Sequence, residues 1–215
     1  PDINLYNENV FPVMYHLLAK GGFNPCPKIM KEEFTPVQIC SALGAAVQYE
    51  RKFGICVDLW GPDIGNWFTR TWAFPGHSPE EFKSALKIAY LMSPDMMFVE
   101  NADALGIKEE YYFRKTIFGE IFEEFTRKFV PENPLFYKSS MAKPDIVVIR
   151  SDDCDFSAGM NLFGSSHLTS NFMTRSPFEI FHILSHNQLP VNGLTYFLPQ
   201  FEYHALTAKQ ELGEK

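Results

Sequence analysis

The sequence predicts an α/β protein built on a parallel sheet, and two observations carry this prediction. First, three segments have a hydroxyl residue followed by proline and, three positions after the hydroxyl, by Gln or Glu; they start at Thr35, Ser78 and Ser176. Such a capping box begins helices, because its side chains satisfy free backbone amides. Second, a short apolar strand follows each of these helices, at residues 55–59, 96–99 and 194–198. Helices that alternate with buried strands are typical of parallel βα units.

Each predicted helix has one apolar face. The three faces consist of Ile39, Leu43, Ala46 and Val47, then Phe82, Ala85, Leu86 and Ala89, and finally Phe178, Phe181 and Leu184. A further helix is expected over residues 109–129, where apolar residues recur at helical spacing before Pro131 and Pro134. Residues 12–20 give a weaker helical pattern, and a loop rich in Gly and Pro follows them.

The predicted domains are unequal. Residues 1–130 supply only two convincing strands, whereas a closed (β/α)8 barrel needs about 250 residues. We therefore expect either a small open α/β protein or part of a barrel whose front is missing. Residues 131–144 contain three prolines and are predicted to be a linker. The run 145–150 is predicted to be the first strand of a second α/β domain over residues 145–215.

Composition excludes some classes of function. The net charge is −7 and no basic stripe is present, so nucleic acid is not an expected partner. No apolar run approaches the roughly 20 residues of a membrane span, so no membrane partner is expected. Cys40 and Cys56 are expected to be buried thiols, and a cytoplasmic location is favoured over secretion. The start at Pro1, without a signal peptide, predicts a processed or trimmed chain, or a part of a longer protein.

Carboxylates follow the predicted strands. Glu100 ends the apolar run 96–99, Asp58 lies near the exit of the strand at 55–59, and Asp152 follows the run 145–150. Ligands and catalytic groups gather at the carboxyl ends of strands in α/β folds. Hydrolysis of a glycosidic bond needs two carboxylates, so Glu100 is the first catalytic candidate. Asp58 and Asp103 are candidates for its partner or for an orienting role. The alternatives for Glu100 are a structural pair with Lys or Arg, a turn cap, or substrate or metal binding.

A long loop between residues 60 and 77 contains every tryptophan of the chain. Its ring faces, with polar side chains between them, suit stacking against sugar rings; an aromatic mini-core is the alternative. The predicted substrate-binding residues are Trp60, Asp63, Trp67, Trp72 and His77 of this loop, together with Asn101 and Asp103 after Glu100. The chain has no zincin motif, Walker loop, dinucleotide fingerprint or nucleophile elbow, so no metal and no cofactor is predicted.

Three stretches together resemble the back half of a glycoside hydrolase (β/α)8 barrel: residues 54–62, 77–82 and 98–102. Residues 144–150 resemble the first strand of a trailing Rossmann-like or amidotransferase-like domain. This arrangement is similar to family 42 β-galactosidases. The resemblance implies a carbohydrate substrate, an active-site Glu at the tip of a late strand (here Glu100), and a second domain that supports homo-oligomerisation.

The chain departs from this family in one respect. The family places an Asn-Glu pair, its acid/base, at the end of an earlier strand. The sequence has one Asn-Glu pair, Asn7-Glu8, which does not follow a convincing strand. If the acid/base lies upstream of Pro1, this chain alone is not a complete enzyme.

Two rival hypotheses remain. One is a non-catalytic α/β module that binds a glycan or a protein; the other is a metal-dependent hydrolase that uses Asp58, Glu100 and Asp152. The distance from Glu100 to a second carboxylate separates the readings, since about 5 to 5.5 Å fits a retaining pair and about 6.5 to 9.5 Å an inverting one. We further expect strands 55–59 and 95–99 to be adjacent and parallel, with Phe98 packed beneath Glu100 on one face.

Overall fold

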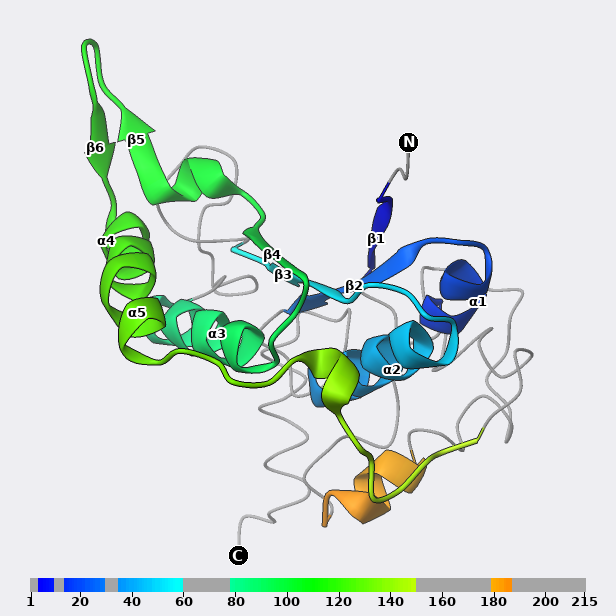
Figure 1. The fold of residues 1–215 in the computed structure, drawn as a ribbon. Coiled ribbons are helices and arrows are strands. Elements are labelled where there is room, and N and C mark those ends of the chain that lie inside the picture. The colour runs from blue at the N-terminus through cyan, green and yellow to red at the C-terminus, as the bar shows by residue number, and fades with distance from the viewer. Residues whose placement is uncertain (1–3, 10–13, 30–34, 60–77, 150–178, 187–215) are drawn as a thin grey trace, which may run out of the picture.

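The computed structural model describes residues 4–9, 14–29, 35–59, 78–149 and 179–186. At its centre is a sheet of four strands in the order β1 (Tyr6–Asn9), β2 (Asn24–Ile29), β3 (Gly54–Val57) and β4 (Met96–Val99). All three neighbouring pairs run parallel (Figure 1). The predicted α/β class and the predicted parallel pairing of β3 with β4 are therefore confirmed.

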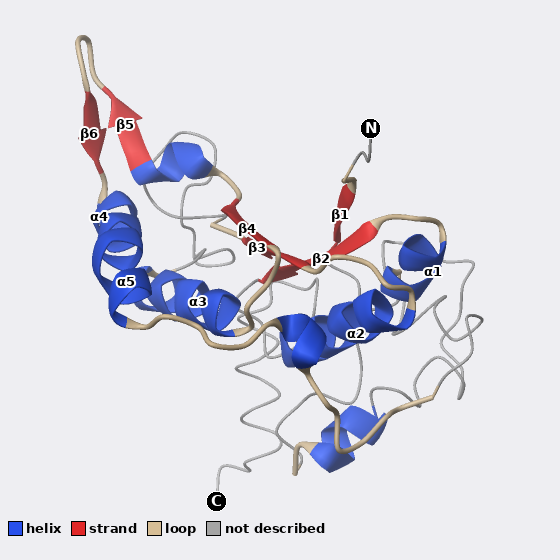
Figure 2. Cartoon of the chain, viewed as in Figure 1, coloured by secondary structure: helices blue, strands red, loops and turns tan. Residues whose placement is uncertain are grey.

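A helix connects each strand to the next. These helices are α1 (Tyr15–Lys20), α2 (Thr35–Gln48) and α3 (Pro79–Leu91), and Figure 2 shows α2 and α3 on the same side of the sheet. The capping box predicted for α3 is present. The backbone N–H of Glu81 donates to Ser78 Oγ at 3.1 Å, and the N–H of Ser78 donates to Glu81 Oε2 at 2.7 Å.

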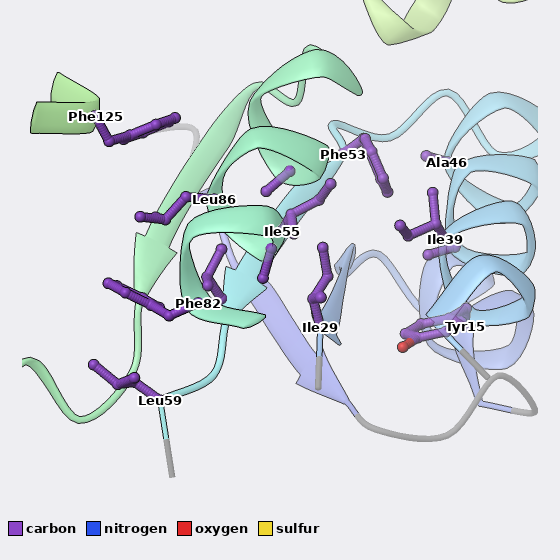
Figure 3. Packing of buried hydrophobic residues seen from close by; sticks show 14 of the residues in the cluster. Tyr15, Ile29, Ile39, Ala46, Phe53, Ile55, Leu59, Phe82, Leu86 and Phe125 are labelled. Carbon is purple, nitrogen blue, oxygen red and sulfur yellow. The ribbon is translucent and has the colours of Figure 1, made fainter. Parts of the chain in front are cut away.

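The main core fills the space between this side of the sheet and the helices. On the sheet side, Ile29, Ile55 and Leu59 are almost fully buried, and Phe82 and Leu86 of α3 pack in the same cluster (Figure 3). Burial of each such side chain contributes about 1.5 to 3 kcal/mol. The helices are therefore fixed on one face, and the opposite face of the sheet is left for other residues.

The strand β2 was not predicted from the sequence, because it contains Pro25 and Pro27. A proline cannot donate to a strand ladder and is rare inside a sheet. In β2 the N–H of Asn24 donates to Leu5 O at 2.8 Å, toward β1. Alternate residues of a parallel strand face alternate neighbours, so the two prolines face β3. There the ladder begins only at Lys28, which pairs with Cys56.

The strand β1 was missed as well, since Tyr-Asn-Glu-Asn has no apolar run. Close packing holds it on the sheet. A Cβ atom on Gly54 would lie 2.9 Å from Tyr6 Cδ1 and 3.1 Å from Cys26 Sγ. The absence of a side chain at Gly54 therefore lets the Tyr6 ring and the Cys26 thiol approach the backbone of β3.

The chain after β4 forms a turn, a short helix and a hairpin. Asn101 adopts a left-handed conformation (φ 56°), which Asn tolerates better than most residues. A short helix η1 (Ala102–Leu105) follows, and the hairpin of β5 (Gly106–Lys108) and β6 (Phe113–Lys115) projects away from the sheet (Figure 1).

The helix predicted over residues 109–129 begins later, as α4 (Ile117–Glu124), and continues through the π-helical turn η2 (Phe125–Phe129) into α5 (Val130–Glu132). The side chain of Thr116 accepts from the N–H of Gly119 and so caps α4 at its true start. The prediction was wrong for residues 109–116, where aromatic side chains favour the hairpin.

The predicted linker, residues 131–144, is held by hydrogen bonds to the end of α3 and to the turn that follows it. Tyr90 Oη donates to Asn133 O at 2.8 Å, and Ser93 Oγ donates to Tyr137 O at 2.8 Å. A short helix, η3 (Ser139–Met141), lies within this segment.

The strand predicted at 145–150 is not formed over the described residues 145–149. Ile146, Val147 and Ile149 are 61, 69 and 90 % exposed. A strand needs a partner for its backbone groups, and the described residues supply none here. Residues 179–184 are helical, as expected after Ser176. The strand at 194–198 lies outside the described residues, and the second domain stays a prediction. Cys56 is buried as expected, but Cys40 is exposed, so that expectation was wrong.

Candidate functional site

The face of the sheet opposite the helices carries polar side chains toward its carboxyl edge. Glu8 pairs in register with Cys26, and Lys28 pairs with Cys56. Residues two apart on a strand share a face. Asp58, two positions after Cys56, therefore lies on this face, and Glu100 does so by the same rule because Cys56 pairs with Phe98.

Backbone hydrogen bonds hold Asp58 and Glu100 just beyond the ends of β3 and β4. The N–H of Asp58 donates to Ile29 O at 3.0 Å, and the N–H of Glu100 donates to Val57 O at 3.1 Å. Phe98 lies two residues before Glu100 and is half-buried. The expected order of Phe98 beneath Glu100 on a shared face is therefore present.

Lys28 lies at the centre of this polar cluster. Its Nζ atom is 3.4 Å from Glu8 Oε1 and 3.5 Å from Asp58 Oδ2, and it forms an ion pair with Glu100 Oε2. The Lys28 side chain is 16 % exposed, while those of Glu8 and Glu100 are 32 and 35 % exposed. The cluster is therefore neither fully buried nor a surface salt bridge.

The charges of the cluster depend on one another. Burial alone would lower the pKa of Lys28, but the facing carboxylates, Asp58 most of all, outweigh burial and hold that pKa above its ordinary value. Asp58 is 1 % exposed, and a buried carboxylate is costly unless it is paired. Lys28 is thus charged at neutral pH and compensates part of the negative charge around it.

Two carboxylates come close together from opposite edges of the sheet. One oxygen of Glu8, one oxygen of Glu100 and the Sγ atom of Cys56 all lie within 4.8 Å of one another. On a flat sheet β1 and β4 would be three strand spacings apart, roughly 14 Å. The side chains of Glu8 and Glu100 therefore converge over the sheet.

Cys56 lies beside this pair as a neutral group. Burial raises the pKa of the Cys56 thiol well above its ordinary value, and the negative charges of Glu8, Asp58 and Glu100 raise it further. The Lys28 ammonium contacts both carboxylates that would complete a metal site, so a metal ion would have to displace it.

The structure brings together some of the predicted site residues and separates others. Glu100 and Asp58 both contact Lys28 and therefore lie in one cluster. Asn101 is half-buried in the turn after Glu100, and Asp103 is exposed on η1. The predicted loop residues lie outside the described part of the chain: Trp60, Asp63, Trp67, Trp72 and His77.

Two members of the cluster were missed from the sequence. In the sequence, Glu8 stands out only as part of an Asn-Glu pair, and no sequence pattern marks Lys28. Both lie on the two strands that the sequence pattern did not reveal. The available signal was the Asn7-Glu8 dipeptide, which required a strand around it to be read as a site.

Comparisons of the chain with protein-family models, with curated proteins and with solved structures found no match. Among the described residues, no helix is both long enough and apolar enough to cross a membrane.

Proposed function

We propose that this chain carries the active site of a retaining glycoside hydrolase, with Glu100 as nucleophile and Glu8 as acid/base. The observation that supports the proposal is the approach of one oxygen from each side chain to within 4.8 Å. In retaining enzymes the two carboxyl groups are about 5 to 5.5 Å apart, close enough for one to attack the sugar directly. Glu8 also belongs to the Asn-Glu pair that the glycosidase resemblance requires at the end of an earlier strand.

The proposed reaction has two steps. In the first, Glu100 attacks the anomeric carbon while Glu8, in its protonated form, donates a proton to the leaving oxygen. This forms a covalent glycosyl-enzyme ester and releases the alcohol. In the second, Glu8 takes a proton from water, the water oxygen attacks the anomeric carbon, and the bond to Glu100 breaks. Both carboxyl groups return to their starting states, and the sugar keeps its anomeric configuration.

The proposal extends to the architecture. We infer that β1 to β4 are consecutive strands of a (β/α) barrel-like sheet, with the active site at their carboxyl ends. The tryptophans at positions 60, 67 and 72 would bind sugar rings beside Glu100. A Rossmann-like domain in the part of the chain after residue 149 would support homo-oligomerisation. Asp58, contacting Lys28 from its buried position, orients the cluster and does not itself act on the sugar.

One observation favours a second candidate, a glycan-binding module without catalysis. The ion pair between Lys28 and Glu100 is the structural role that the sequence left open for Glu100. If that pair never opens to substrate, the cluster only stabilises the sheet edge, and binding would fall to the aromatic loop.

Glutamine variants of the full chain separate these functions. We expect a panel of aryl glycosides to contain at least one substrate, and Glu100→Gln to lower its turnover by several orders of magnitude. Glu8→Gln should lower turnover most for leaving groups that need protonation. Glu109→Gln is the matched control, because Glu109 forms an exposed ion pair with Arg114 on the hairpin. Near-normal turnover by Glu100→Gln, with folding intact, would refute the catalytic role. Glycan binding without any turnover would favour the binding module.

A further inference from the structure

Lys28 reaches three carboxylates from a single strand. It lies on β2, between Glu8 on β1 and Asp58 beyond β3, and its Nζ atom also contacts Glu100 beyond β4. Among the described ion pairs, the remaining Lys and Arg side chains pair with glutamates on the hairpin and on α4. Within that part of the chain, Lys28 is the cation that faces this cluster.

The carboxylates need such a cation to stay close while ionised. Two like charges sharing a site make one of them take up a proton at higher pH, whereas an opposite charge within about 4 to 6 Å favours the ionised form. If all groups are ionised, three carboxylates and one ammonium give the cluster a net charge of −2. Without the ammonium the same groups would carry −3 in a half-buried space.

We propose that Lys28 is a positioning residue whose ammonium group bridges Glu8 and Glu100 and offsets the repulsion between their carboxylates. It contacts the two reacting carboxylates themselves, and it acts on the sugar only through them. Its consequence for turnover rests on the proposed glycosidase function, but its effect on their ionisation does not.

Among the described residues, the other groups around the cluster leave this role to Lys28. The thiols of Cys26 and Cys56 face it from β2 and β3, and burial raises the pKa of each, so both are neutral where carboxyl groups titrate. Asp58 brings a further negative charge from β3. The ammonium of Lys28 stays charged over this pH range, since its pKa lies above the ordinary value.

The test is a carboxyl titration of the full chain by NMR, with glutamate labelled at the side-chain carboxyl carbon. In Lys28→Met the titration midpoint of the Glu8 and Glu100 signals should move to higher pH by about 1 to 3 units, the range for loss of an adjacent opposite charge. Lys28→Arg keeps the charge and should move it much less. Lys83→Met is the matched control, because Lys83 pairs with Glu124 on the exposed surface, and it should leave these signals unchanged.

A second variant covers the case in which Lys28→Met does not fold. The double variant Lys28→Met/Asp58→Asn keeps the net charge of the cluster at −2 while removing the bridge, and it should still shift the midpoint upward. An unchanged midpoint in whichever of the two folds overturns the proposal, as does an equal shift in Lys83→Met.

The acid limb of the pH profile of kcat/KM, measured on the best aryl glycoside, should move with the midpoint. A shifted midpoint in a chain that cleaves no glycoside would leave the role of Lys28 intact and count against the glycosidase. Glycoside cleavage with an unshifted midpoint would do the reverse.

Discussion

Two helical glycines provide a matched test of how α4 packs after the Glu100 strand. Gly119 lies in the first turn of α4, where a Cβ atom would be 2.1 Å from the backbone oxygen of Leu105. Gly44 lies inside α2, where the nearest atom to a Cβ would be His16 Nε2 at 4.0 Å. The substitutions Gly119→Ala and Gly44→Ala therefore add the same methyl group to a closed space and to an open one.

The expected magnitudes follow from this difference in space. In a helix interior, alanine is better than glycine by about 1 kcal/mol, so Gly44→Ala should raise the free energy of unfolding by about that amount. In Gly119→Ala the same gain is opposed by a contact with backbone, which cannot rotate away. Overpacking of this kind costs about 1 to 3 kcal/mol or more. We expect a net loss, because α4 must move away from Leu105 and strain the Thr116 cap, whose Oγ1 donates to Ala104 O at 2.7 Å.

Urea unfolding of the full chain, followed by circular dichroism, measures both variants against the wild type. The midpoint should rise for Gly44→Ala and fall for Gly119→Ala. A Gly119→Ala protein as stable as the wild type would show that α4 does not press on η1 as described. A destabilised Gly44→Ala protein would show that α2 has less space than the structure gives it.

The remaining predictions concern a helix cap and a buried thiol. Ser78→Ala should lower the free energy of unfolding by about 1 kcal/mol, because the amide of Glu81 loses its acceptor; Ser78→Thr keeps the acceptor, and an equal loss in both variants would contradict the capping role. Burial and then the charge of Glu8 raise the pKa of Cys26 to about 12 from an ordinary value of 9.0. The thiol of the unfolded chain ionises first as pH rises. The contribution of Cys26 to the free energy of unfolding should therefore be constant below pH 9 and fall between pH 9 and 12, by up to about 1.4 kcal/mol per pH unit. Cys26→Ala should flatten that fall in urea midpoints measured at a series of pH values, and an unchanged slope would show that the thiol does not contribute.

Local signals in the sequence predicted the second half of the sheet well. The capping box at Ser78 satisfies its own backbone amides, so it specifies the start of α3 without knowledge of the rest of the fold. The apolar run 96–99 favours a strand, and its four side chains are half-buried in β4. Together they predicted β3, α3 and β4, and hence the position of Glu100 at the strand end.

The first half of the sheet, β1 and β2, depends on contacts between residues that are distant in the sequence. The strand β2 tolerates Pro27 because its ladder with β3 is short, and β1 is held by the packing of Tyr6 over Gly54. Neither contact leaves a pattern within one segment. Without these strands, Glu8 and Lys28 could not be placed beside Glu100, and half of the candidate site was missed.

The two errors in predicted elements have one cause. Residues 109–116 follow the helical spacing of the segment after them, and residues 145–149 have the composition of a strand. Thr116 ends the first pattern by capping α4 at Ile117. The second finds no partner among the described residues. In both, the deciding factor lay outside the local pattern: a helix cap in the first, and the lack of a partner strand among the described residues in the second.

The most direct test of the central claim is to identify the residue that becomes bound to the sugar. The full chain is treated with the 2-deoxy-2-fluoro derivative of its best aryl glycoside, which slows the second step of a retaining reaction, and its peptides are analysed by mass spectrometry. The proposed mechanism predicts one sugar attached to Glu100 in the wild type, and none in Glu100→Gln. Attachment to a different residue, or turnover that inverts the anomeric carbon without any attachment, would contradict the assignment of Glu100 and Glu8 as a retaining pair.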